Sequence, residues 1–130
     1  MTLLLIQFVG ALGLTIVIEF AVVWVLGGRS ADELGAVALV NVMTNPALNV
    51  ALLVVRLAVL PALRAVLATY AEWAFIGVAE VVVVLAEWRL IAWALRADPR
   101  TWLVRSVAMN ATSFVLGSWL LALAVRALAR

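Results

Sequence analysis

The sequence predicts an all-α, polytopic membrane protein with four transmembrane helices. Of its 130 residues, 68% are hydrophobic and only 12% are charged, whereas charged residues make up about 25% of an average soluble protein. Four apolar stretches are long enough to cross a bilayer, and short polar segments separate them. A soluble domain of this length could not bury so much apolar surface. We therefore expect one integral membrane domain over residues 1–130.

The first span is expected at residues 3–26, where Glu19 is the single charged residue. Gly27 and Gly28 favour the end of this helix, and Ser30 or Asp32 is a suitable cap for the next one. No basic residue precedes the apolar stretch. We therefore interpret it as a retained helix rather than a signal peptide.

The second span, residues 34–55, combines an apolar background with four polar side chains, Asn41, Thr44, Asn45 and Asn49. Pro46 lies among them and cannot donate a backbone hydrogen bond, so we expect a helix kink that frees the carbonyl of Val42. In lipid this carbonyl needs a donor within the protein. We expect Asn41, Thr44 or Asn45 to supply it.

Residues 56–70 are ambiguous because Arg56, Pro61 and Arg64 interrupt the apolar pattern. One interpretation is a short interfacial helix that begins near Pro61, with arginine head groups reaching the surface. The alternative is an extension of the next helix. Both remain open from the sequence.

The third and fourth spans are expected at residues 71–95 and 102–123, joined by a turn around Asp98 and Pro99. Arg89 and Arg105 lie just inside these spans, and they either form ion pairs with Glu87 or reach the lipid headgroups. Four tryptophans near the predicted span ends fit an interfacial aromatic belt: Trp24, Trp73, Trp93 and Trp102.

The two halves of the chain show a related spacing. Glu19 precedes Asn41 by 22 residues, and Glu87 precedes Asn110 by 23. Each asparagine is followed three residues later by a hydroxyl, which belongs to Thr44 and to Ser113. The spacing indicates two helical hairpins in the same orientation, a parallel internal repeat. With 1.5 Å per residue, the glutamates and asparagines should lie about 10–12 Å below one interface.

A carboxylate at the centre of a membrane helix costs at least ~2.5–3.5 kcal/mol. Such a group must hold a proton or be compensated by a cation or by hydrogen-bond donors. Carboxylate and amide oxygens are hard ligands, so the pattern predicts a proton or cation site. Its expected members are Glu19, Glu80, Glu87, Asn41, Thr44, Asn45, Asn49, Asn110 and Ser113. The alternative is that these groups only join helices through hydrogen bonds.

The motif Asn41-x-x-Thr44-Asn45-Pro46-x-x-Asn49, together with the three glutamates and the Asn110-x-x-Ser113 pair, resembles uncharacterised small bacterial four-span membrane proteins. This resemblance covers most of the chain and implies a fold but no activity. Small multidrug transporters are similar in size and have a first-helix glutamate, but the surrounding residues differ. Small fluoride channels are also similar in size, but their Thr-Phe-Ser-type motif is absent.

We expect a transporter or channel for protons or small cations. A non-transporting membrane subunit or assembly partner is the alternative, and an intramembrane enzyme acting on lipid is a third hypothesis that needs an opening beside Glu80 and Glu87. The chain has no cysteine or histidine and no phosphate-binding loop, so we expect no metal site, no cofactor and no classical catalytic centre. It also lacks the polar basic patch of a nucleic-acid-binding protein.

All nine basic residues are arginines, and they divide almost evenly between the two sides of the membrane. Arg56, Arg64, Arg126 and Arg130 lie on the side of the termini, and Arg29, Arg96 and Arg100 lie on the other. This balance permits either orientation, or dual insertion as an antiparallel homodimer. The expected location is a bacterial inner membrane.

Overall fold

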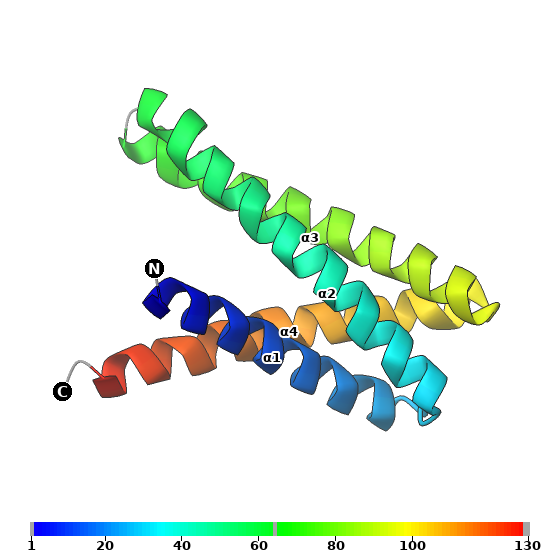
Figure 1. The fold of residues 1–130 in the computed structure, drawn as a ribbon. Coiled ribbons are helices and arrows are strands. Elements are labelled where there is room, and N and C mark those ends of the chain that lie inside the picture. The colour runs from blue at the N-terminus through cyan, green and yellow to red at the C-terminus, as the bar shows by residue number, and fades with distance from the viewer. Residues whose placement is uncertain (1, 64, 129–130) are drawn as a thin grey trace.

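The chain forms four long α-helices in a computed structural model that describes residues 2–63 and 65–128 (Figure 1). They are α1 (Thr2–Val25), α2 (Ala31–Val54), α3 (Ala65–Leu95) and α4 (Pro99–Leu128). No strand occurs in these ranges. The predicted all-α class is confirmed, and the first two helices begin and end within a few residues of the predicted spans.

The turns are set by side chains that cap the helices. The Ser30 hydroxyl accepts a hydrogen bond from the Glu33 backbone N–H at 3.1 Å, and the Glu33 carboxylate accepts one from the Ser30 N–H at 3.2 Å. This reciprocal pair is a capping box, which satisfies free N–H groups at the start of α2. Asp98 caps α4 similarly, and the hydrogen bonds from Thr101 hold the pKa of its carboxyl below the usual range.

The segment between α2 and α3 differs from the first interpretation. After Val54 the chain continues as a π-helix, Val55–Val59, and a 3₁₀ turn, Leu60–Ala62. Pro61 lacks an N–H and crowds the preceding turn, and the wider π-helix just before it accommodates this irregularity. The prediction of a separate interfacial helix near Pro61 is therefore wrong: residues up to 62 extend α2. The alternative, an extension of the next helix, is confirmed for residues 65–70, because α3 begins at Ala65. Arg64 and Arg130 lie outside the described residues.

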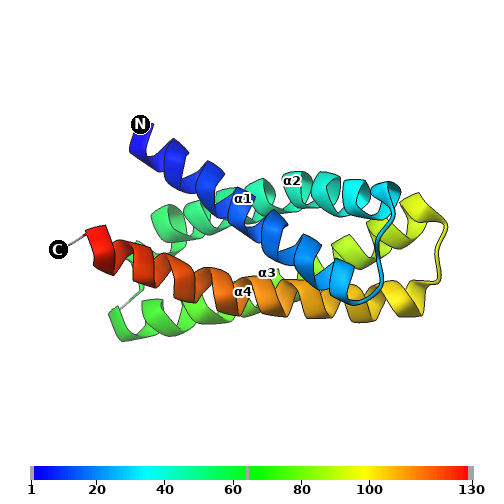
Figure 2. The same cartoon turned by 90° about the horizontal axis from the view of Figure 1, so that it is seen from below.

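The helices pair across the two halves of the chain. α1 lies along α4, and α2 lies along α3. The two pairs converge at the end where the α1–α2 and α3–α4 turns lie, and they diverge toward the chain termini (Figures 1 and 2). As a result, all four helices approach one another at the end of the two turns, and the two pairs lie farther apart at the end of the chain termini.

The apolar core is small and lies at the converging end. It contains Val23, Val37, Val40, Ile91, Ala92, Trp102 and Met109. Trp102 is only 1% exposed, so its predicted place in an interfacial belt is wrong, whereas Trp93 is 79% exposed.

The solvent-accessible surface area of the protein is 8922 Å², compared with about 6,700 Å² for a compact soluble protein of this mass. The exposed side chains include many valines, leucines and tryptophans.

One helix of the described chain is long and apolar enough to cross a membrane. It runs from Ala31 to Ala62 and includes the π-helical and 3₁₀ turns. A shorter apolar stretch covers Val9–Val25 in α1.

Candidate buried carboxylate site

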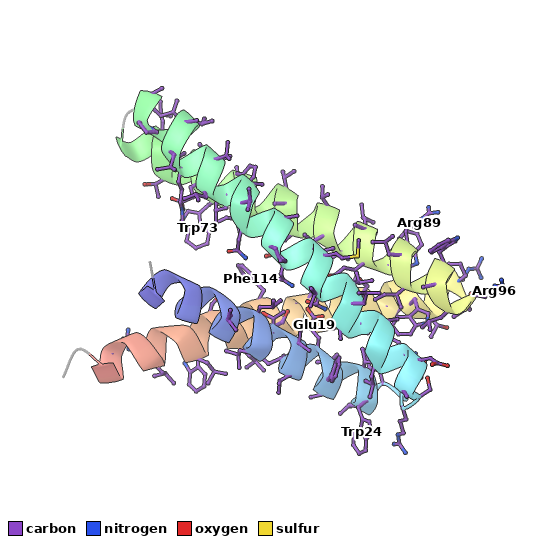
Figure 3. All side chains as sticks on the ribbon, viewed as in Figure 1. Glu19, Trp24, Trp73, Arg89, Arg96 and Phe114 are labelled. Atoms are coloured by element: carbon purple, nitrogen blue, oxygen red, sulfur yellow. The ribbon has the colours of Figure 1, made fainter. Side chains whose placement is uncertain are left out.

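Among the residues that the structure describes, six polar side chains lie buried where the helix pairs converge. Glu19, Asn41, Glu87 and Ser106 have no exposed surface, and Asn110 and Ser113 are nearly as well buried. All four helices contribute to this cluster. Figure 3 shows Glu19 of α1 lying between α2 and α4. Burying this many polar groups costs free energy unless each one finds a hydrogen-bond partner.

Glu19 accepts one hydrogen bond on each carboxylate oxygen. The amide nitrogen of Asn41, on the adjacent helix α2, donates to Oε2. The Ser113 hydroxyl of α4 lies 3.2 Å from Oε1. The side chain is therefore fixed from both sides, by a residue of its own hairpin and by a residue of the other hairpin.

Glu87 is held in the same manner. The amide nitrogen of Asn110, on the adjacent helix α4, donates to Oε2. The Thr44 hydroxyl of α2 lies 2.8 Å from Oε1. Each glutamate thus contacts the asparagine of its own half and the hydroxyl of the opposite half. This reciprocal exchange links the four helices at one point.

The two asparagines are also anchored to their own helices in the same manner. Asn41 Nδ2 lies 3.1 Å from the carbonyl oxygen of Val37, and Asn110 Nδ2 lies 3.0 Å from that of Ser106. Each amide therefore bridges a backbone carbonyl four residues earlier and a glutamate on another helix. The anchoring fixes which face of each helix presents the donor. Asn45 extends the cluster by donating to Asn41 Oδ1 at 2.6 Å.

The expected donors to the carbonyl of Val42 make other contacts. Thr44 bonds to Glu87 and to the carbonyl of Val40, and the amides of Asn41 and Asn45 are engaged as described above. The prediction that one of them donates to Val42 is wrong. α2 also passes through Pro46 as one continuous helix. Asn49 is exposed and donates to the carbonyl of Asn45, so it lies outside the buried cluster.

No arginine reaches the buried carboxylates in the described part of the chain. Arg105 forms its ion pair with Glu33, at 2.7 Å, and also donates to the carbonyl of Leu26 at 3.2 Å. Arg89 lies over the ring of Trp88, 4.4 Å from its centroid. The expected ion pairs with Glu87 are therefore not formed. Arg105 instead fastens the start of α4 to the α1–α2 turn, and its hydrogen bond lowers the pKa of the Glu33 carboxyl.

Glu80 lies apart from the hydrogen-bonded cluster. It lines a cavity of about 570 Å³ between α3 and α4, and within the described residues it makes no hydrogen bond or ion pair. The same residues contain no group of three or more acidic, histidine or cysteine side chains that could hold a metal ion. The site is thus a pair of carboxylates surrounded by donors, with a third carboxylate nearby.

Ser106 shares a helix face with Asn110 and Ser113 in the sequence, but it was not among the predicted site residues. Its hydroxyl donates to the carbonyl of Val84 at 2.9 Å, so it joins α4 to α3, as the Asn110–Glu87 contact also does. The signal was available, because Ser106 lies four residues before Asn110 on the same helix face.

No protein family model, curated protein or solved structure matches this chain. The resemblance to small four-span bacterial membrane proteins therefore stays a prediction. Any functional conclusion depends on the geometry and chemistry of the site.

Proposed function

We propose that the protein is a small integral membrane transporter or channel for protons or small cations, and that Glu19 and Glu87 form its titrating site. One observation carries this proposal. Two fully buried carboxylates lie at the meeting point of four helices, with no arginine beside them in the described residues. Burial without a basic partner makes such a carboxylate pair a favourable site for a proton or a mobile cation.

Our proposal that all four helices lie in a bacterial inner membrane rests on the lengths of the helices and on the apolar side chains exposed on their outer faces. The helices contain 24, 24, 31 and 30 residues, and about 20 residues suffice to cross the hydrocarbon core. The apolar side chains on the outer faces would contact lipid. We propose that the four helices correspond to two hairpins related by a pseudo-two-fold axis along the membrane normal, as the matched Glu–Asn pairs suggest.

Among cations, a proton fits this site best. The neighbours of the carboxylates are N–H and O–H donors, whereas a bare metal ion needs additional oxygen ligands. Donors that surround a carboxylate stabilise its negative charge. They therefore favour reversible release of a proton over tight binding of a metal ion.

The hydroxyl groups can adapt to either protonation state. Thr44 Oγ1 lies 2.8 Å from Glu87 and 3.0 Å from the carbonyl of Val40, but it has only one proton to donate. When Glu87 is ionised, Thr44 donates to it. When Glu87 is protonated, it donates to Thr44, which then donates to Val40. Ser113 has the same choice between Glu19 and the carbonyl of Asn110, at 3.2 and 3.1 Å.

The experiment is a proton-flux assay with purified protein in liposomes that contain a pH-sensitive dye. Wild type should dissipate a pH gradient, and Glu87→Gln should abolish this flux because the amide cannot bind and release a proton. Glu72→Gln is the matched control, because Glu72 pairs with Arg56 outside the cluster. Absence of flux in folded wild-type protein, tested with protons and alkali cations, would contradict the proposal.

A structural role is the competing function. The hydrogen-bonded cluster joins all four helices, as expected for a non-transporting subunit or an assembly partner. In that case Glu87→Gln would lower stability and there would be no flux to lose. A lipid-acting enzyme would need an opening beside both Glu80 and Glu87, and the cavity between α3 and α4 is lined by Glu80 but not by Glu87. A homodimer would cover part of the exposed apolar surface.

A further inference from the structure

The cavity between α3 and α4 has features that the proton site does not explain. It is lined by Trp73, Gly77 and Glu80 of α3 and by Val107, Asn110 and Phe114 of α4. In Figure 3, Trp73 and Phe114 both point into the space between the diverging helix pairs. A volume of about 570 Å³ lies within the range of ~300–1,000 Å³ that accommodates small organic ligands.

Glu80 gives this cavity its chemical character. It is the single ionisable side chain in the lining, and the other lining residues are apolar or aromatic apart from Asn110. Glu80 is half-buried, and no arginine pairs with it in the described residues. A carboxylate in an apolar cavity attracts a cationic group, and the ring faces of Trp73 and Phe114 also favour one.

Asn110 connects this cavity to the buried site. It is a lining residue of the cavity, and its side-chain amide donates to Glu87. A ligand that contacts Asn110 would disturb one of the two hydrogen bonds that hold Glu87. Occupation of the cavity and the charge state of Glu87 would then influence each other.

We propose that this cavity is the binding site for a lipophilic organic cation, whose charged nitrogen pairs with Glu80 while its apolar body lies against Trp73 and Phe114. This inference rests on the proposed function, because it identifies the substrate class whose movement the Glu19–Glu87 pair would couple to protons. The other natural occupant of an apolar cavity in a membrane protein is a lipid tail. A lipid tail would not depend on the charge of Glu80.

The test is isothermal titration calorimetry on the full-length protein in detergent micelles, with benzyltrimethylammonium as the cation. Neopentylbenzene, a neutral molecule of nearly the same shape, is the matched ligand. We expect Glu80→Gln to weaken binding of the cation about tenfold or more and to leave binding of the neutral ligand unchanged. Asp32→Asn removes the same charge at the exposed start of α2 and should change neither affinity.

The titration tests cation binding independently of the proposed proton transport. Equal affinity of the cation for wild type and Glu80→Gln, or no saturable binding of the cation to folded wild type, would overturn the inference. Equal loss of both ligands in Glu80→Gln would also overturn it, because charge would then be irrelevant. The titration uses no ion gradient. Cation binding without proton flux would therefore contradict only the proposed function, and flux without cation binding would contradict only this inference.

Discussion

The hydrogen bond between Asn110 and Glu87 permits a quantitative test of the buried site. Its contribution can be isolated with a double-mutant cycle built from Asn110→Leu, Glu87→Leu and the double variant. Each leucine is close in size to the residue it replaces and removes all hydrogen bonding at its position. The second oxygen of Glu87 keeps its contact with Thr44 in the Asn110→Leu variant.

The expected magnitude depends on the charge of the acceptor. Hydrogen bonds between neutral side chains on membrane helices contribute about 0.6 kcal/mol on average, whereas a hydrogen bond to a charged group contributes about 1.5–3 kcal/mol. Both residues of this pair are buried, so water does not replace the lost partner. At a pH at which the Glu87 carboxyl is ionised, we therefore expect a coupling free energy of about 1.5–3 kcal/mol. The coupling should decrease at low pH, as the carboxyl takes up its proton.

The free energy of unfolding can be followed in mixed micelles by tryptophan fluorescence, since Trp102 lies in the core and is 1% exposed. A second cycle on Asn41 and Glu19 should give a similar coupling, because the two contacts are geometrically equivalent. A coupling near 0.6 kcal/mol in both cycles, with no dependence on pH, would refute the reasoning. It would mean that the carboxyl groups act as ordinary neutral partners.

Two further predictions concern the α1–α2 turn. The Arg105 guanidinium lowers the pKa of Glu33, so the stability from this pair is present at neutral pH and is lost as the pH falls below the ordinary glutamate range. Arg105→Gln should flatten the acid dependence of the melting temperature, and an unchanged dependence would contradict this. Gly28→Ala would place its Cβ 2.5 Å from a methyl group of Val23 and should destabilise the protein by about 1–3 kcal/mol. A Cβ added at Gly10 would have no atom within 4 Å, so Gly10→Ala should leave the free energy of unfolding unchanged or raise it slightly. Equal changes in the free energy of unfolding for the two substitutions would contradict the packing of this turn.

The sequence indicated which residues lie at one depth but not how their side chains connect. Spacing along a helix predicts depth, and this was enough to expect Glu19, Asn41, Glu87 and Asn110 in one layer. The cross-contacts from Ser113 to Glu19 and from Thr44 to Glu87 depend on how each helix is rotated about its axis. In helices that are apolar on all sides, the hydrophobic pattern does not define that rotation.

The ion pairs show a second limit of sequence reasoning. Arg105 was expected either to pair with Glu87 or to reach the lipid headgroups, but it pairs with Glu33, 72 residues away along the chain. This contact exists because α4 lies along α1, and the capping box at Ser30 orients Glu33 toward it. The order in which helices pack around one another was not predictable from spacing. The separation of Glu80 from the hydrogen-bonded cluster, in contrast, follows from spacing alone, because seven residues of α3 place it about 10 Å along the helix from Glu87.

Proton flux in liposomes, measured in parallel for Glu19→Gln and Glu87→Gln, tests the central claim most directly. If the two carboxylates form one proton site, each substitution alone should abolish the flux while the protein remains folded, and Glu72→Gln should retain it. Flux that persists in either glutamine variant at the wild-type rate would contradict the account, because the carboxylate concerned would then have no part in moving protons.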